Sequence, residues 1–200
     1  MGTEFGAFNF IGTLAAVING LGIVRWLNSL ADFLKRKDSM AVEHYWVYTL
    51  AAFFQFVMHV LLWWSLWSVR DAATLNFVTY LYMLLGPILL FLGSAFLAPD
   101  IEGDRLNLKQ HYYTARPVYF TMLVLVWFWA SLASLVFRGM LSDSAPVLLM
   151  FLAIALLQRL TASEFVQRSA VILSWLVMLV FVLSFGKELG GLSPLFDLDF

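Results

Sequence analysis

The segment from Tyr45 to Val69 contains no charged residue. A helix needs ~20 apolar residues to cross a hydrocarbon core of ~30 Å, so this segment is long enough to span a membrane. The whole chain has the same character, because 62% of its 200 residues are hydrophobic and 12% are charged. An ordinary soluble domain has about 45–50% apolar and about 25% charged residues. We therefore expect an all-α integral membrane protein.

Six apolar segments are separated by charged or turn-forming residues and predict one domain of six transmembrane helices. The helices are expected at about residues 8–33, 44–69, 73–98, 117–138, 145–164 and 168–186, with one sizeable loop at 99–116. Lys and Arg gather in the connections after the first, third and fifth segments, at Lys35, Arg36, Lys37, Arg105, Lys109, Arg116, Arg159 and Arg168. The positive-inside rule makes these connections cytoplasmic and puts both termini on the non-cytoplasmic side.

Polar side chains lie deep in two of the predicted spans. Gln55, His59 and Trp63 share one helix face because they are four residues apart. An ionisable group at that depth is costly unless it faces a partner or a water-filled cavity. With a rise of ~1.5 Å per residue, several residues of other spans fall near the depth of His59 and join it and Gln55 in a candidate midplane pathway: Asn19, Gly86, Pro87, Trp127 and Trp175.

This midplane group allows two interpretations. A proline in mid-membrane frees backbone groups, which are tolerated only against protein or water. The functional interpretation is a central site or pore constriction lined by His59, Gln55 and Asn19 beside Gly86 and Pro87. The structural interpretation is a buried histidine that is hydrogen-bonded to a neighbouring helix, beside an ordinary proline kink.

The first predicted span also carries a charge inside the membrane. Arg25 lies ~9 Å on the cytoplasmic side of the midplane and needs a partner if it is buried. It can meet Asp32 through Ser29, meet a residue of another helix, or snorkel to the surface. The functional interpretation makes Arg25 and Asp32 an inner-mouth charge that contacts an anion or a lipid headgroup.

A polar rim is expected at the cytoplasmic ends of the spans. Glu43, His44 and His111 are types of residue that bind zinc or iron, but their distances are not fixed by the sequence, and a solvated rim is the default. We predict no metal and no cofactor. The rim comprises Glu43, His44, His111, Arg116, Arg159, Glu164 and Arg168.

The predicted spans lack the residues that several kinds of membrane site require. No Lys lies within a predicted span to hold a retinal Schiff base, and no second histidine lies at the depth of His59 for a bis-histidine haem. We also expect no Ser-His-Asp arrangement in the membrane, so that enzyme chemistry would be confined to the cytoplasmic rim.

Four short motifs stand out along the chain: Gly20-Leu21-Gly22, the Trp-rich end of the second span, Pro99-Asp100 with Glu102-Gly103, and His111-Tyr112-Tyr113 before Arg116. In this combination the chain resembles a group of small bacterial six-helix membrane proteins. The resemblance implies a bacterial inner-membrane location and carries no activity with it.

The first functional expectation is an oligomeric channel or transporter for an ion or small solute, because a 22.7 kDa bundle has little internal room for a pathway. The alternatives are a scaffold whose loop 99–116 contacts a cytoplasmic protein, and a lipid-modifying enzyme. Membrane lipids are expected partners, whereas a net charge of -1 disfavours nucleic acid. A water-accessible His59 would favour transport, whereas a dry and packed His59 would favour the scaffold. An open lateral cleft at His44, His111 and Glu43 would favour the lipid-modifying enzyme.

Overall fold

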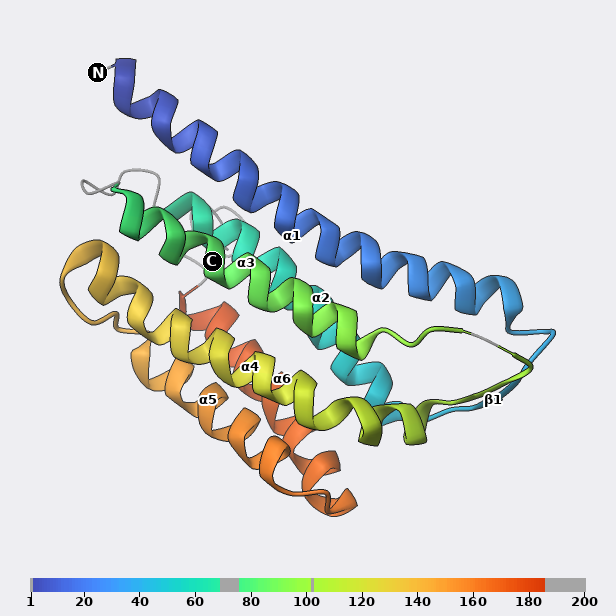
Figure 1. The fold of residues 1–200 in the computed structure, drawn as a ribbon. Helices are drawn as coiled ribbons and strands as arrows, with labels where there is room; N and C mark the ends of the chain where they lie inside the picture. The colour runs from blue at the N-terminus through green and yellow to red at the C-terminus, as the bar shows by residue number, and fades with distance from the viewer. Residues whose placement is uncertain (1, 69–75, 102, 186–200) are drawn as a thin grey trace, which may run out of the picture.

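The computed structural model describes residues 2–68, 76–101 and 103–185, and over these residues the chain forms six helices and one two-stranded sheet (Figure 1). The expected all-α class is therefore confirmed. The helices are α1 (Gly2–Arg36), α2 (Trp46–Ser68), α3 (Phe77–Leu97), α4 (Leu108–Arg138), α5 (Ala145–Leu160) and α6 (Glu164–Phe185).

Five of the described helices are long and apolar enough to cross a membrane, namely α1, α2, α3, α4 and α6. This is compatible with a multi-pass membrane protein. Helix α5 has 16 residues, which corresponds to ~24 Å and is shorter than a ~30 Å hydrocarbon core. Six crossings and the sides of the two termini stay predictions.

The sheet joins the connections that follow α1 and α3. Strands β1 (Ala41–Glu43) and β2 (Arg105–Asn107) pair in parallel, with Val42 opposite Leu106. The sheet therefore marks one end of the bundle, where α1 and α3 end and α2 and α4 begin (Figure 1). We call it the strand end.

Helix α4 begins nine residues before the expected start at Pro117, so half of the predicted loop 99–116 is helical. The side chain of Asn107 accepts a hydrogen bond from the backbone N–H of Gln110 at 2.7 Å and caps the helix. Pro117 thus lies inside the helix rather than in its first turn. At the other end, Gly139 stops α4 with a left-handed φ of 70°.

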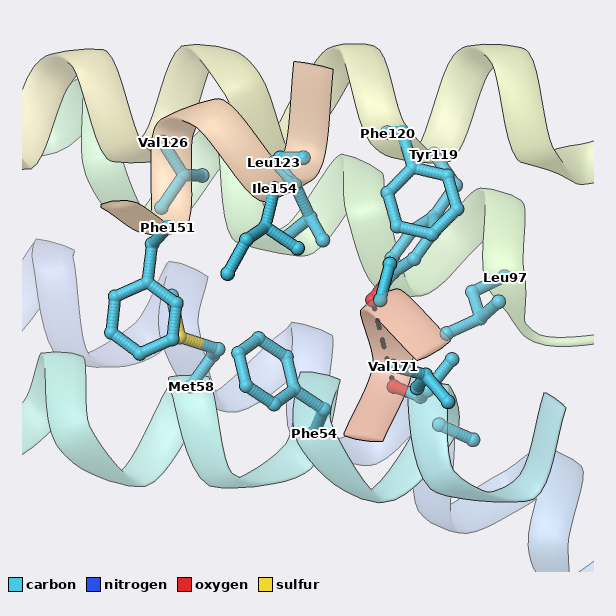
Figure 2. Close-up of a cluster of buried hydrophobic side chains, with 14 of the residues drawn as sticks. Phe54, Met58, Leu97, Tyr119, Phe120, Leu123, Val126, Phe151, Ile154 and Val171 are labelled. Carbon is cyan, nitrogen blue, oxygen red and sulfur yellow. Dashed lines mark hydrogen bonds between the residues drawn. The ribbon is translucent and has the colours of Figure 1, made fainter. Parts of the chain in front are cut away.

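The helices form two packed groups that share α2 and α3. Helix α1 packs on α3 and α2, whereas α4 packs on α3 and α5, and α6 packs on α5 and α2. The main hydrophobic core lies between α2, α4, α5 and α6, and Figure 2 shows Phe54, Phe151, Ile154 and Leu123 converging there. Among the five span-length helices, α1 is the least buried.

Candidate functional site

Four polar side chains meet where α1, α2 and α3 pack together. They are Asn19 of α1, Gln55 and His59 of α2, and Ser94 of α3, and we call them the polar cluster. Their exposed fractions are 2%, 0%, 0% and 0% respectively. The structure thus brings together three residues of the predicted midplane group and adds Ser94.

Hydrogen bonds fix the direction of each contact in the cluster. The Nδ2 of Asn19 donates to the backbone oxygen of His59 at 3.1 Å, so the other side-chain atom, Oδ1, is the acceptor. Because Oδ1 lies 2.7 Å from Nδ1 of His59, this ring nitrogen carries the proton. Nε2 of His59 is then free to accept from the hydroxyl of Ser94, whose Oγ is 2.7 Å away. The three side chains form a row of hydrogen bonds in which Ser94 donates to His59 and His59 donates to Asn19.

Gln55 lies beside the hydrogen-bonded side chains of Ser94, His59 and Asn19. Its Nε2 donates to the backbone oxygen of Leu90 at 2.8 Å and to Oγ of Ser94 at 3.2 Å. Its Oε1 is buried and has no hydrogen-bond partner within the described parts of the chain. Nε2 of Gln55 also lies 3.4 Å from Nε2 of His59, so Gln55 adds an N–H group beside both Ser94 and His59.

Two glycines leave space for the side chains of the polar cluster. A Cβ atom on Gly22 of α1 would overlap the imidazole of His59, lying 2.8 Å from Nε2, and one on Gly93 of α3 would lie 3.1 Å from Nε2 of Gln55. Glycine at both positions allows α1 and α3 to approach α2 closely, as small residues do between membrane helices.

The other predicted midplane residues do not join the polar cluster. Trp127 stacks on Phe151 with ring centroids 4.2 Å apart, and Nε1 of Trp175 donates to the backbone oxygen of Leu50 at 3.2 Å. Gly86 faces the ring of Trp129, and α3 continues through Pro87. These residues belong to packing contacts elsewhere in the bundle, so they do not share a lining with His59.

Arg25 finds its partner on another segment. Its Nη2 lies 2.6 Å from Oδ1 of Asp100, which follows α3. Asp32, the partner considered from the sequence, instead lies 3.8 Å from Lys35. Ser29 also donates to the backbone oxygen of Pro99 at 3.1 Å. These contacts attach α1 to the end of α3, and the inner-mouth role of Arg25 and Asp32 stays a prediction.

The predicted rim divides into several structural contacts. Arg116 donates to the backbone oxygens at the end of α5, while Glu164 pairs with Lys109 at 2.9 Å and with Arg168 at 2.6 Å. The remaining contacts are Glu43 with Asn107, His111 Nε2 with the oxygen of Leu97, and Arg159 with Thr121. Among the described residues no group of three His, Cys, Asp or Glu could hold a metal ion.

Tyr45 lies between β1 and α2 and packs against two aromatic rings of α4. Its ring centroid is 5.6 Å from that of Tyr112 and 6.2 Å from that of Tyr113. Burial and the neighbouring Tyr113 hydroxyl raise the pKa of Tyr45, so its hydroxyl stays protonated at neutral pH. The group acts as a packing contact under these conditions.

A groove of about 170 Å³ opens between α1, α2 and the end of α3 near the strand end. Its walls are mainly apolar. Three lining residues carry polar groups that make no hydrogen bond within the described chain: the imidazole of His44 and the hydroxyls of Tyr48 and Thr49. The other lining residues are Trp26, Ser29, Leu30, Phe33, Ala52, Phe53, Leu97, Ala98, Pro99 and Leu108. We call this feature the strand-end groove.

Along α2 and at the end of α3, the strand-end groove is about one helical turn from the polar cluster. Ala98 follows Ser94 by four residues, and Ala52 precedes Gln55 by three. On α1, Trp26 follows Asn19 by seven residues, which is about two turns. One turn rises ~5.4 Å, so the groove and the cluster are neighbours along the bundle.

Ser94 is the site residue that sequence reasoning missed. It is a small residue in an apolar span and has no spacing relationship with His59 in the sequence. The sequence analysis considered only a Ser-His-Asp arrangement, whereas the cluster joins a serine and a histidine to Asn19 in place of an acid. The available signal was a polar residue beside Gly93, at a close helix contact.

Comparison of the chain with protein-family models, curated proteins and solved structures found no match.

Proposed function

We propose that the chain is a multi-pass membrane protein that binds a single-chain amphiphile from the cytoplasmic leaflet in the strand-end groove. The observation that carries the proposal is the composition of the groove, whose apolar walls surround polar groups of His44, Tyr48 and Thr49 that make no hydrogen bond within the described chain. The charge asymmetry of the sequence supports a cytoplasmic position for the strand end.

The chemistry of the groove favours a ligand with both an apolar and a polar part. His44 is exposed and Tyr48 and Thr49 are half-buried, so their polar groups can form hydrogen bonds with a polar headgroup. Trp26, Phe33 and Phe53 supply aromatic walls for a hydrocarbon chain. The bilayer itself surrounds such a groove with candidate ligands.

The size of the groove limits the ligand. Its volume of about 170 Å³ is several times the ~30 Å³ share of one water molecule. It is also smaller than the ~300–1,000 Å³ of sites that enclose drug-sized ligands. These values support a headgroup and part of one acyl chain, and do not support a whole two-chain phospholipid.

Transport through the midplane has less support than amphiphile binding. His59 is 0% exposed and both its ring nitrogens are hydrogen-bonded, so a solute could pass it only if these contacts broke. Transport, and the homo-oligomer proposed with it, stay predictions that the single chain does not test.

Photo-crosslinking tests the proposal directly. The full chain in lipid nanodiscs is irradiated with diazirine-bearing palmitic acid, and crosslinked peptides are identified by mass spectrometry. We expect crosslinks on residues of the groove that decrease with excess unlabelled palmitic acid. The variant Ala52→Phe, which fills the groove, should remove them, whereas Ala153→Phe on the exposed face of α5 should not. Crosslinks spread evenly over the outer helix faces, without competition, would overturn the proposal.

A further inference from the structure

We infer that Ser94, His59 and Asn19 form an acyl-transfer site inside the membrane, which hydrolyses an acyl ester of the amphiphile bound in the strand-end groove. The choice of substrate rests on the proposed function. The site itself rests on the geometry of the polar cluster.

The cluster has the arrangement that an activated serine requires. A nucleophile and its base must lie within ~2.6–3.2 Å, and the base must be oriented by a third group. Oγ of Ser94 is 2.7 Å from Nε2 of His59, and Nδ1 of His59 is 2.7 Å from Oδ1 of Asn19. The proton on Nδ1 leaves Nε2 as the acceptor, which is the tautomer that a general base needs. A neutral amide in the third position is known from Cys-His-Asn sites.

Gln55 supplies a donor for the charge that develops during the reaction. Its Nε2 lies 3.2 Å from Oγ of Ser94, and the same nitrogen is held by the backbone oxygen of Leu90. One N–H therefore stays fixed to Leu90 while the other lies beside the atom that bonds to the substrate. A fixed donor at this position can stabilise the oxyanion of a tetrahedral intermediate.

The reaction balances with water as the only co-reactant. Oγ of Ser94 bonds to the ester carbonyl carbon and its proton moves to Nε2 of His59. The bond between that carbon and the ester oxygen breaks, and the alcohol leaves with the proton. Water then attacks the acyl-serine, gives a proton through Nε2 of His59 to Oγ of Ser94, and releases the carboxylic acid.

Access to Ser94 requires α1 to move away from α2 and α3. Ser94 and His59 are both 0% exposed, and Trp26 of α1 lines the groove, with its ring 5.0 Å from that of Phe56. Helix α1 is the least buried of the span-length helices. An ester whose chain occupies the groove lies about one turn from Ser94, so a small displacement of α1 at Trp26 would admit it.

Covalent labelling tests the nucleophile without knowledge of the natural ester. The full chain in nanodiscs is incubated with a long-chain alkyl fluorophosphonate, and the adduct is located by peptide mass spectrometry. We expect one adduct per chain, on Ser94. The variant Ser94→Ala should lose it, whereas Ser174→Ala should keep it, because Ser174 is also buried but donates to the backbone oxygen of Ala170 at 2.9 Å.

The roles of His59 and Asn19 are tested by the rate at which their variants are labelled. His59→Gln should slow labelling by at least ~100-fold, the lower end of general-base contributions. Asn19 is a positioning residue, so Asn19→Ala should slow labelling and Asn19→Asp should restore most of the rate. Hydrolysis of p-nitrophenyl palmitate should follow the same order.

The inference is overturned if the folded wild-type chain carries no adduct on Ser94, or if His59→Gln labels at the wild-type rate. This result is separate from that of the crosslinking experiment. Groove crosslinks without an adduct on Ser94 would retain amphiphile binding and remove the acyl-transfer site. An adduct on Ser94 without groove crosslinks would retain the nucleophile and remove the groove ligand as its substrate.

Discussion

Gly22 of α1 lies directly against the imidazole ring of His59 of α2, and a Cβ atom at residue 22 would be 2.8 Å from Nε2. The imidazole cannot retreat, because Asn19 and Ser94 hold its two nitrogens. The close approach of α1 to α2 therefore depends on the absence of a side chain at residue 22.

Gly22→Ala should destabilise the bundle by ~1–3 kcal/mol, the range for an added methyl group in a packed interior. Thermal unfolding in detergent, followed by circular dichroism, measures the change. Gly20→Ala is the matched control, because nothing lies within 4 Å of a Cβ at residue 20. This control should be neutral or slightly stabilising, since alanine favours a helix more than glycine does. Equal unfolding temperatures for the two variants would contradict the packing described here.

Arg116 should be the rim residue that matters most for stability. Its Nη1 lies 2.8, 2.8 and 2.7 Å from the backbone oxygens of Gln158, Arg159 and Thr161, which end α5 without intrahelical partners. Hydrogen bonds to a charged group contribute ~1.5–3 kcal/mol, so Arg116→Met should cost about 2 kcal/mol in unfolding by denaturant. Arg105→Met, at an exposed residue of β2, serves as control. A loss of the same size in both variants would show that the contacts to α5 contribute nothing specific.

Composition and helix length were enough to predict the helical class and the meeting of Asn19, Gln55 and His59. A rise per residue gives the depth of a side chain in the membrane, but it does not give the direction in which the side chain points around the helix. Trp127 and Trp175 have a suitable depth, yet they contact Phe54, which lies on a different face of α2 from Gln55 and His59. Trp63 shares the helix phase of His59 but is 53% exposed, so a shared phase does not bury both residues equally.

The rest of the site depends on contacts between distant residues. Ser94 reaches His59 only because Gly93 and Gly22 let three helices approach, and a sequence pattern in one helix does not contain that information. The strand-end groove likewise depends on how α1, α2 and α3 are positioned along one another. The sequence left open a partner for Arg25 on another helix but did not identify Asp100, which lies beyond the end of α3.

The orientation of the chain can be tested with single cysteines, because the natural sequence contains none. Lys37→Cys and Arg105→Cys place a thiol at the strand end, and Asp143→Cys places one between α4 and α5. A membrane-impermeant maleimide added to intact cells should label only Asp143→Cys, because the positive-inside rule makes the strand end cytoplasmic. Lysed cells should allow all three to react. Labelling of Lys37→Cys in intact cells would reverse the proposed orientation.

The aromatic core should contribute to stability independently of the polar cluster. Trp127 is 5% exposed, and its ring stacks on that of Phe151 at an interplanar angle of 6°. Trp127→Ala should therefore destabilise the chain by ~3–5 kcal/mol, as large-to-small changes at buried aromatic residues do. Trp63→Ala is the matched control and should change stability by less than ~0.5 kcal/mol, since half of that side chain already faces outward. If the two tryptophans proved equally important in unfolding by denaturant, the packing of α2 against α4 and α5 would have to be revised.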